Sequence, residues 1–251
     1  MRAALLALLI AAPATAQVNT ERMRRQLGDD RLHLALDASA AVARGNADFL
    51  QVGLGGRLDL RAVEDDLAFV VGRLDLARSD GASFVDRSFV HARYNTDLVP
   101  RLVWETFVQV ERNGPQRLRA RTLIGGGVRY EVVDRDSVGL AAGLLPMFER
   151  EVLDEALGEP TSVVRASSYV SARLSLANAT LSTTTYLQPQ ISEPDDFRVL
   201  TQAAVEVGVT RWVRIRVRAD LRYDSRPPVG VEPTDVRIEN GLVLVIPAGD
   251  P

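Results

Sequence analysis

Charged and apolar side chains alternate along the stretch RIRVRADLRYDS, which runs from Arg214 to Ser225. Every second residue from Arg214 to Asp224 is charged, and each residue between them is apolar or aromatic. A helix would repeat its apolar positions about every 3.6 residues, whereas successive side chains of a strand point to opposite faces. The pattern therefore predicts a β-strand whose two faces contact different surroundings.

The same alternation recurs along the chain, and turn-forming residues separate the copies. The predicted strands cover residues 31–42, 50–61, 67–78, 83–97, 101–112, 117–131, 137–151, 161–176, 180–192, 197–209, 214–225 and 235–246. They are roughly 10–16 residues long, whereas globular strands average about 5–6 residues and membrane-spanning strands need about 9–11. Their length favours strands that cross a membrane.

These strands predict an all-β fold, a transmembrane antiparallel up-and-down β-barrel of about 12 strands, with ten or fourteen as alternatives. The apolar face would contact lipid and the charged face would line the interior. Lipid cannot supply hydrogen bonds to an open sheet edge, so the sheet must close on itself. An even strand number places both termini on the periplasmic side and the long connections 152–160 and 225–234 on the outer side.

The first residues have the features of a secretory signal peptide. Arg2 supplies a positive charge, residues 3–12 are apolar, and small residues lead to a predicted cleavage site after Ala16. We therefore expect a signal peptide over residues 1–16, a short periplasmic segment over 17–30, and a barrel over 31–251 in the outer membrane of a Gram-negative bacterium. The chain contains no cysteine, which excludes disulfides and thiolate metal sites.

The inward face is rich in arginine and carboxylate side chains. The candidate lumen-lining residues are Arg117, Arg119, Arg121, Arg214, Arg216, Arg218, Arg222, Glu105, Glu111, Asp220, Asp224 and Glu239. Successive arginines, as at Arg117/Arg119/Arg121 and Arg214/Arg216/Arg218, would suit a passage for anions. Acids are interleaved with arginines on the same strands, however, and this favours a lumen filled with salt bridges.

Other chemistry finds little support in the sequence. His33 and His91 fall on predicted inward faces, and neither has a nearby serine in a recognisable catalytic arrangement or a metal-ligand spacing. We therefore expect no enzymatic activity, no metal and no cofactor, with a lipid-modifying enzyme as the weakest alternative. The net charge of −3 argues against nucleic-acid binding. The expected partners are outer-membrane lipid and, during biogenesis, the barrel-assembly machinery.

Several segments resemble one known family. They are NTERMR at 19–24, GN at 45–46, HARYN at 91–95, FVQVERN at 107–113, RLRARTLIGGGVRY at 117–130 and YDSRPPVGVEPTDVRIENGLVLVI at 223–246. In this order they resemble the YdiY-like family of salt-induced outer-membrane proteins, whose defining domain has no known function. The resemblance implies an outer-membrane barrel and brings no catalytic residues. A salt- or stress-responsive structural barrel is therefore the first hypothesis, and a small porin for ions or small anionic solutes is the second.

Overall fold

A computed structural model describes residues 32–43, 49–61, 66–79 and 82–247. The predicted signal peptide (1–16) and periplasmic segment (17–30) lie outside the described residues. The strands are β1 (Leu32–Ala43), β2 (Phe49–Arg61), β3 (Leu67–Ser79), β4 (Ala82–Val99), β5 (Leu102–Asn113), β6 (Leu118–Asp134), β7 (Val138–Leu153), β8 (Thr161–Leu176), β9 (Ala179–Pro189), β10 (Phe197–Gly208), β11 (Val213–Asp224) and β12 (Thr234–Pro247). Two single-turn 3₁₀ helices are η2 (Gly114–Gln116) and η3 (Glu155–Leu157).

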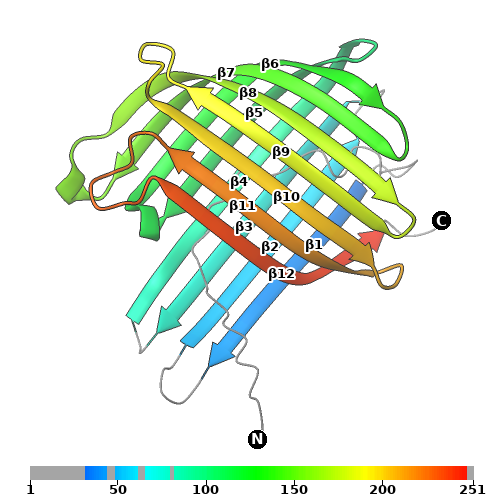
Figure 1. Ribbon diagram of the computed structural model, residues 1–251, viewed down its shortest axis with the longest axis horizontal. Coiled ribbons are helices and arrows are strands. Elements are labelled where there is room, and N and C mark those ends of the chain that lie inside the picture. Colours follow the sequence, from blue (N-terminus) through cyan, green and yellow to red (C-terminus); the bar gives the residue numbers. More distant parts are fainter. Residues whose placement is uncertain (1–31, 44–48, 62–65, 80–81, 248–251) are drawn as a thin grey trace, which may run out of the picture.

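The described strands form one closed antiparallel barrel (Figure 1). Each strand pairs with its neighbours in the sequence, and β12 pairs with β1 to complete the ring. The predicted all-β barrel of about twelve strands is confirmed. Because strand directions alternate, the connections after β5, β7, β9 and β11 lie at one end, called here the loop end. The connections after β4, β6, β8 and β10 lie at the other, called the turn end.

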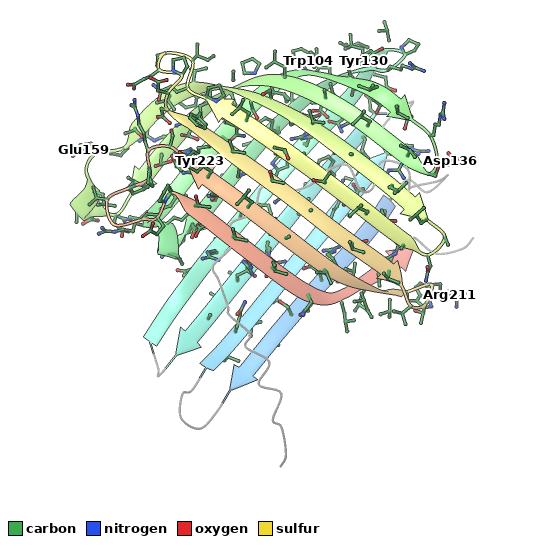
Figure 2. All side chains as sticks on the ribbon, viewed as in Figure 1. Trp104, Tyr130, Asp136, Glu159, Arg211 and Tyr223 are labelled. Atoms are coloured by element: carbon green, nitrogen blue, oxygen red, sulfur yellow. The ribbon has the colours of Figure 1, made fainter. Side chains whose placement is uncertain are left out.

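The outer surface carries the apolar residues of the alternation. Along β5, every second residue from Val103 to Asn113 is buried inside the barrel, while Trp104, Val108 and Val110 are exposed on the outside. Exposed aromatic residues gather near the turn end, where Trp104 and Tyr130 project outward (Figure 2). Aromatic rings at this height are typical of the interface between hydrocarbon and headgroups. Among the described residues, no helix is long and apolar enough to cross a bilayer.

The interior is packed in one part and hollow in another. Apolar and aromatic side chains fill the space between β5 and β10. This apolar cluster consists of Phe107, Leu123, Leu145, Met147, Tyr169, Tyr186 and Leu200. The interior beside β1, β2 and β3 instead contains glycines, arginines and acids around a cavity.

One strand departs from the predicted alternation at its start. Arg117 adopts a left-handed backbone conformation, with φ of 55°. The pairing of β6 with β7 then shifts between Leu118 and Ala120. This β-bulge turns Leu118 into the barrel, where only 2% of it is exposed. The predicted inward arginines Arg117, Arg119 and Arg121 would place Leu118 on the lipid side by alternation. This is wrong because a bulge inserts a residue and reverses the alternation.

Candidate functional site

The structure places most of the predicted lumen-lining residues in two groups, and Glu105, Arg117 and Arg119 lie outside both. Glu111, Arg121, Arg222 and Asp224 lie at the loop end of the interior. A second group lies further along the barrel and consists of Arg214, Arg216, Arg218, Asp220 and Glu239. Glu105 lies toward the turn end and accepts a hydrogen bond of 2.7 Å from the Tyr169 hydroxyl.

Arg117 and Arg119 are at the rim and not in the lumen. Half of the Arg119 side chain is exposed, and its guanidinium pairs with Glu155 at 2.6 Å. Arg117 pairs with Asp154 and donates to the carbonyl oxygen of Val229. The prediction that these two residues line the lumen beside Arg121 was wrong, because the bulge and the left-handed turn redirect both side chains.

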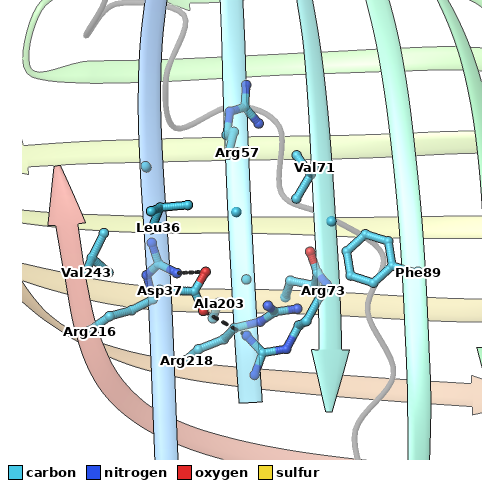
Figure 3. A pocket seen from close by; sticks show the side chains of 15 residues that line it. Leu36, Asp37, Arg57, Val71, Arg73, Phe89, Ala203, Arg216, Arg218 and Val243 are labelled. Carbon is cyan, nitrogen blue, oxygen red and sulfur yellow. Dashed lines mark hydrogen bonds and ion pairs between the residues drawn. The ribbon is translucent and has the colours of Figure 1, made fainter. Parts of the chain in front are cut away.

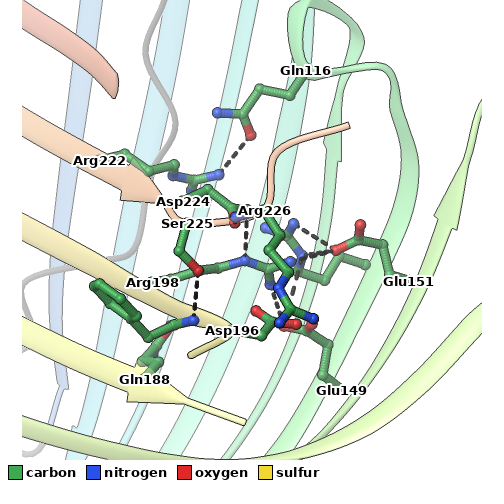
Figure 4. Close-up of polar contacts among 12 residues, drawn as sticks. Gln116, Glu149, Glu151, Gln188, Asp196, Arg198, Arg222, Asp224, Ser225 and Arg226 are labelled. Carbon is green, nitrogen blue, oxygen red and sulfur yellow. Dashed lines mark hydrogen bonds and ion pairs between the residues drawn. The ribbon is translucent and has the colours of Figure 1, made fainter. Parts of the chain in front are cut away.

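Seven residues form what we call the loop-end charge cluster, in which ion pairs join every member to another (Figure 4). They are Glu111, Arg121, Glu149, Glu151, Arg198, Arg222 and Asp224. Arg198 on β10 contacts Glu149 at 2.6 Å and Glu151 at 3.0 Å, both on β7. Arg121 on β6 contacts Glu151 at 2.6 Å. Guanidinium groups bind carboxylates through several N–H donors at once, so such pairs are rigid as well as strong. The cluster ties β6, β7 and β10 together inside the barrel.

One contact of this cluster spans the whole lumen. Arg222 on β11 donates to Glu111 on β5 at 3.2 Å. In the ring of strands, β5 and β11 stand opposite each other, with five strands between them on either side. Side chains that meet across this diameter divide the lumen at that height.

The connection between β11 and β12 covers the same end. Ser225 donates to the carbonyl oxygen of Asp195, and Arg226 pairs with Glu193 at 2.8 Å. A small cavity beneath the connection is lined by Pro227, Pro228 and Val231 together with Arg121 and Arg222. The hydrogen bond from Arg226 holds the pKa of the Glu193 carboxyl below its usual value.

The second group of charges surrounds Asp37 on β1 (Figure 3). Arg73 on β3 contacts Asp37 at 3.0 Å and Glu239 on β12 at 2.8 Å. Arg216 and Arg218 on β11 reach the same space and pair with Glu206 and Asp220 through their Nε atoms. The Nη1 atom of Arg216 also lies 3.9 Å from an Asp37 carboxylate oxygen. These contacts bring β1, β3, β11 and β12 together around a cavity.

The predicted inward histidines are both buried, and neither has a catalytic partner set. His91 lies between the rings of Phe69 and Phe107 at centroid distances of 6.0 and 5.5 Å. His33 lies 3.8 Å from Asp59. Within the described residues, no group of three or more His, Asp or Glu side chains is arranged to hold a metal ion.

The predicted lumen-lining set lacks three members of the loop-end charge cluster, Glu149, Glu151 and Arg198. Strand alternation places Arg198 and Glu149 on the inward face, but it does not indicate that they meet. The apolar cluster was also missed. Its signal is present in stretches such as LLPMF (144–148), where apolar residues occupy both faces of the strand.

Comparison with known proteins is consistent with the barrel. Residues 36–245 match a family model described as a protein of unknown function, DUF481. This match covers more than half of the chain, so the chain belongs to that family, and the predicted family resemblance is confirmed. No curated protein matches the chain.

Solved structures of outer-membrane barrels have a similar fold. The NanC porin aligns with a TM-score of 0.52 and 8% identity, over 85% of this chain and 99% of that chain. The KdgM porin aligns with a TM-score of 0.46 and 10% identity, over 85% and 98%. The translocator domain of the autotransporter NalP from Neisseria meningitidis aligns with 0.40 and 13% identity, over 84% and 86%. The chain therefore shares the closed β-barrel fold of the NanC porin.

Proposed function

We propose that this member of the family is a structural barrel of the outer membrane, closed to ions along its axis. The observation that carries the proposal is the contact between Arg222 and Glu111, which joins opposite walls of the ring. Arg198, Glu149 and Glu151 reinforce the closure from β7 and β10. The interior charges are largely paired, which favours a mechanical role over a charged conduit. The proposal assigns no catalytic activity to the chain.

Export is part of the proposal. A signal peptide cleaved after Ala16 would deliver the chain to the periplasm, and the barrel-assembly machinery would insert it into outer-membrane lipid. The predicted response to salt or stress would then concern the integrity of the membrane. N-terminal sequencing of the protein from an outer-membrane fraction tests the cleavage site, and a start at a residue other than Gln17 contradicts it.

The test of the function is conductance in a planar lipid bilayer. Refolded protein is first checked on a gel, because folded barrels resist SDS and change mobility only after heating. We expect no steady conductance from the wild type. The double variant Arg198→Ala/Arg222→Ala removes the cross-lumen contacts and should raise conductance, whereas Arg119→Ala at the rim should not. Steady conductance of the wild type would overturn the proposal.

A channel for small anions is the second candidate. The cavity beside Arg73, Arg216 and Arg218 is the observation in its favour. This candidate expects wild-type conductance with anion selectivity, and that selectivity should fall when Arg216 and Arg218 are both replaced by glutamine. If the wild type conducts and the replacement leaves its anion selectivity unchanged, the cavity lies outside the permeation path.

A further inference from the structure

The junction between β1 and β12 is the shortest pairing in the ring. β1 pairs with β2 along its full length, up to Ala43. Among the described residues, its pairing with β12 stops where Ala38 meets Leu242. Residues 39–43 of β1 and 237–241 of β12, which the register would place opposite each other, are therefore not paired with each other, and the two strands diverge toward the loop end (Figure 1). We call this divergence the seam.

An unpaired seam is costly in a membrane. Hydrocarbon offers no hydrogen bonds, so backbone N–H and C=O groups that face it without partners cost several kcal/mol each. A polar molecule that enters the seam would supply these partners. The seam also lies at the loop end, and longer connections are typical of the extracellular side of such barrels. The leaflet that meets the seam is therefore the outer one.

Two adjoining cavities lead from the seam into the barrel, and they share Asp37, Arg73, Arg216, Arg218 and Val243. The smaller, of about 30 Å³, lies against the seam. Its walls include the last pair and the first unpaired residues, namely Ala38, Leu242, Ser39, Asn240 and Gly241. The larger, of about 80 Å³, continues inward to Gln202.

The inner cavity contains hydrogen-bond donors without partners. Gln202 is only 4% exposed, and within the described residues neither atom of its side-chain amide makes a hydrogen bond. Arg216 and Arg218 donate through Nε to Glu206 at 2.7 Å and Asp220 at 2.9 Å. The Nη1 atom of Arg216 also lies 3.9 Å from an Asp37 carboxylate oxygen, an ion pair longer than a hydrogen bond. Among the described residues, the Nη atoms of Arg218 make no hydrogen bond. A buried amide is normally satisfied, so the Gln202 amide has hydrogen-bonding capacity that a ligand can use.

The chemistry of the cavities selects the ligand. An oxyanion suits the Nη groups of Arg218 and the side-chain NH₂ of Gln202, because carboxylate and phosphate oxygens only accept hydrogen bonds when ionised. Arg216 would share its guanidinium between this oxyanion and Asp37. The remaining wall is apolar and includes Leu36, Val71, Phe89 and Val243. A molecule with an oxyanion at one end and an acyl chain at the other matches both parts of the site and the adjoining bilayer.

We propose that a membrane amphiphile with an oxyanion head group enters through the seam and places that head group on Arg216, Arg218 and Gln202. Its acyl chain lies along the seam and leaves the barrel between β1 and β12. This binding site goes beyond the structural role and needs no axial channel, so the conductance measurement and the binding measurement fail independently.

The first experiment measures binding of a dansyl-labelled fatty acid to the folded, full-length protein in detergent micelles. We expect saturable binding, weakened at least about tenfold by Arg216→Gln/Arg218→Gln, since charged hydrogen bonds are lost. Gln202→Leu should also weaken binding, and it breaks no existing hydrogen bond, so the fold is preserved. Arg119→Gln at the rim is the matched control and should bind like the wild type. The proposed site is overturned if the wild type shows no saturable binding, or if the wild type and the three variants bind equally well.

The second experiment closes the seam. Because the chain has no cysteine, Ala40→Cys/Asn240→Cys can be bridged across the seam by a short bis-maleimide. The control pair Val90→Cys/Val110→Cys lies on the outer face where β4 and β5 are already paired, away from both cavities. We expect the bridge at 40 and 240 to block the labelled fatty acid and the control bridge to have no effect. Lateral entry is overturned if the bridge at 40 and 240 leaves binding undiminished and free acetate or phosphate competes with the labelled fatty acid. The ligand would then be a soluble anion that enters from the lumen.

Discussion

The two sides of this barrel have the same outer surface and opposite interiors. Between β5 and β10, aromatic and apolar side chains fill the interior. Beside β1, β2 and β3, the inward positions carry Gly53, Gly55 and Asp37, and a cavity remains. Alternation therefore determines which residues face inward, whereas the size of those residues determines whether the lumen is filled.

Glycine has a different role on each side. On the filled side, a Cβ atom at Gly143 would lie 2.2 Å from the Tyr169 ring, and one at Gly125 would lie 2.6 Å from Phe107. These glycines make room for rings that cross the lumen. On the hollow side, a Cβ at Gly55 would lie 2.2 Å from a carboxylate oxygen of Asp37, and one at Gly53 would lie 2.5 Å from the Ser39 hydroxyl oxygen. Here the glycines make room for polar side chains of β1.

The largest expected effect comes from breaking the loop-end charge cluster. Arg198→Met leaves Glu149, Glu151 and Asp224 without a shared partner, and loss of one member of a buried ion pair costs about 3–5 kcal/mol. Arg218→Met on the hollow side should cost less, because within the described ranges Arg218 has one ion-pair partner, Asp220, and borders a cavity that admits water. Urea unfolding followed by tryptophan fluorescence measures both free energies. Equal losses would contradict the difference in solvation between the two sides.

A smaller effect is expected from adding one methyl group to the filled interior. Gly143→Ala forces the Tyr169 ring to move and should destabilise the barrel by about 1–3 kcal/mol, as overpacking does. Gly72→Ala is the control, because its methyl group would point outward on the same face as the exposed Val70 and Leu74 and should change stability by less than about 0.5 kcal/mol. The same urea measurement compares the two variants. A Gly72→Ala variant that loses as much stability as Gly143→Ala would contradict overpacking against Tyr169 as the cause.

The smallest effect concerns the exposed pair between Arg226 and Glu193 over the loop end. The pKa of Glu193 is lowered in the folded protein, so the pair contributes fully above the ordinary glutamate pKa. The contribution is lost as the pH falls through the lowered value. Protease cleavage within residues 225–233 should therefore increase in acid, and Glu193→Gln should remove this pH step by making cleavage equally fast at neutral pH. A pH step that persists in Glu193→Gln would assign it to another group.

Alternation predicted the strands well because it depends only on residues that are neighbours along one strand. The ends of β3, β8 and β11 fall within a residue of the expected ranges 67–78, 161–176 and 214–225. It failed at Leu118 and Arg119, since a bulge depends on how β6 meets β7 and leaves no mark in the period of two. Arg216, Arg218 and Asp220 were placed inside by the same period, but their common cavity with Asp37 follows from the closing of the ring.

The sequence by itself predicted about twelve strands, the lipid-facing and inward-facing sets except at the start of β6, and the charged character of the lumen. These depend on residue type and on the spacing of neighbours along one strand. Only the tertiary structure decided that Arg222 meets Glu111 across the ring, that Phe107 and Tyr169 fill one side, and that β1 and β12 part beyond Ala38. Those contacts join residues far apart in the chain, and their distances depend on how twelve strands close into one barrel.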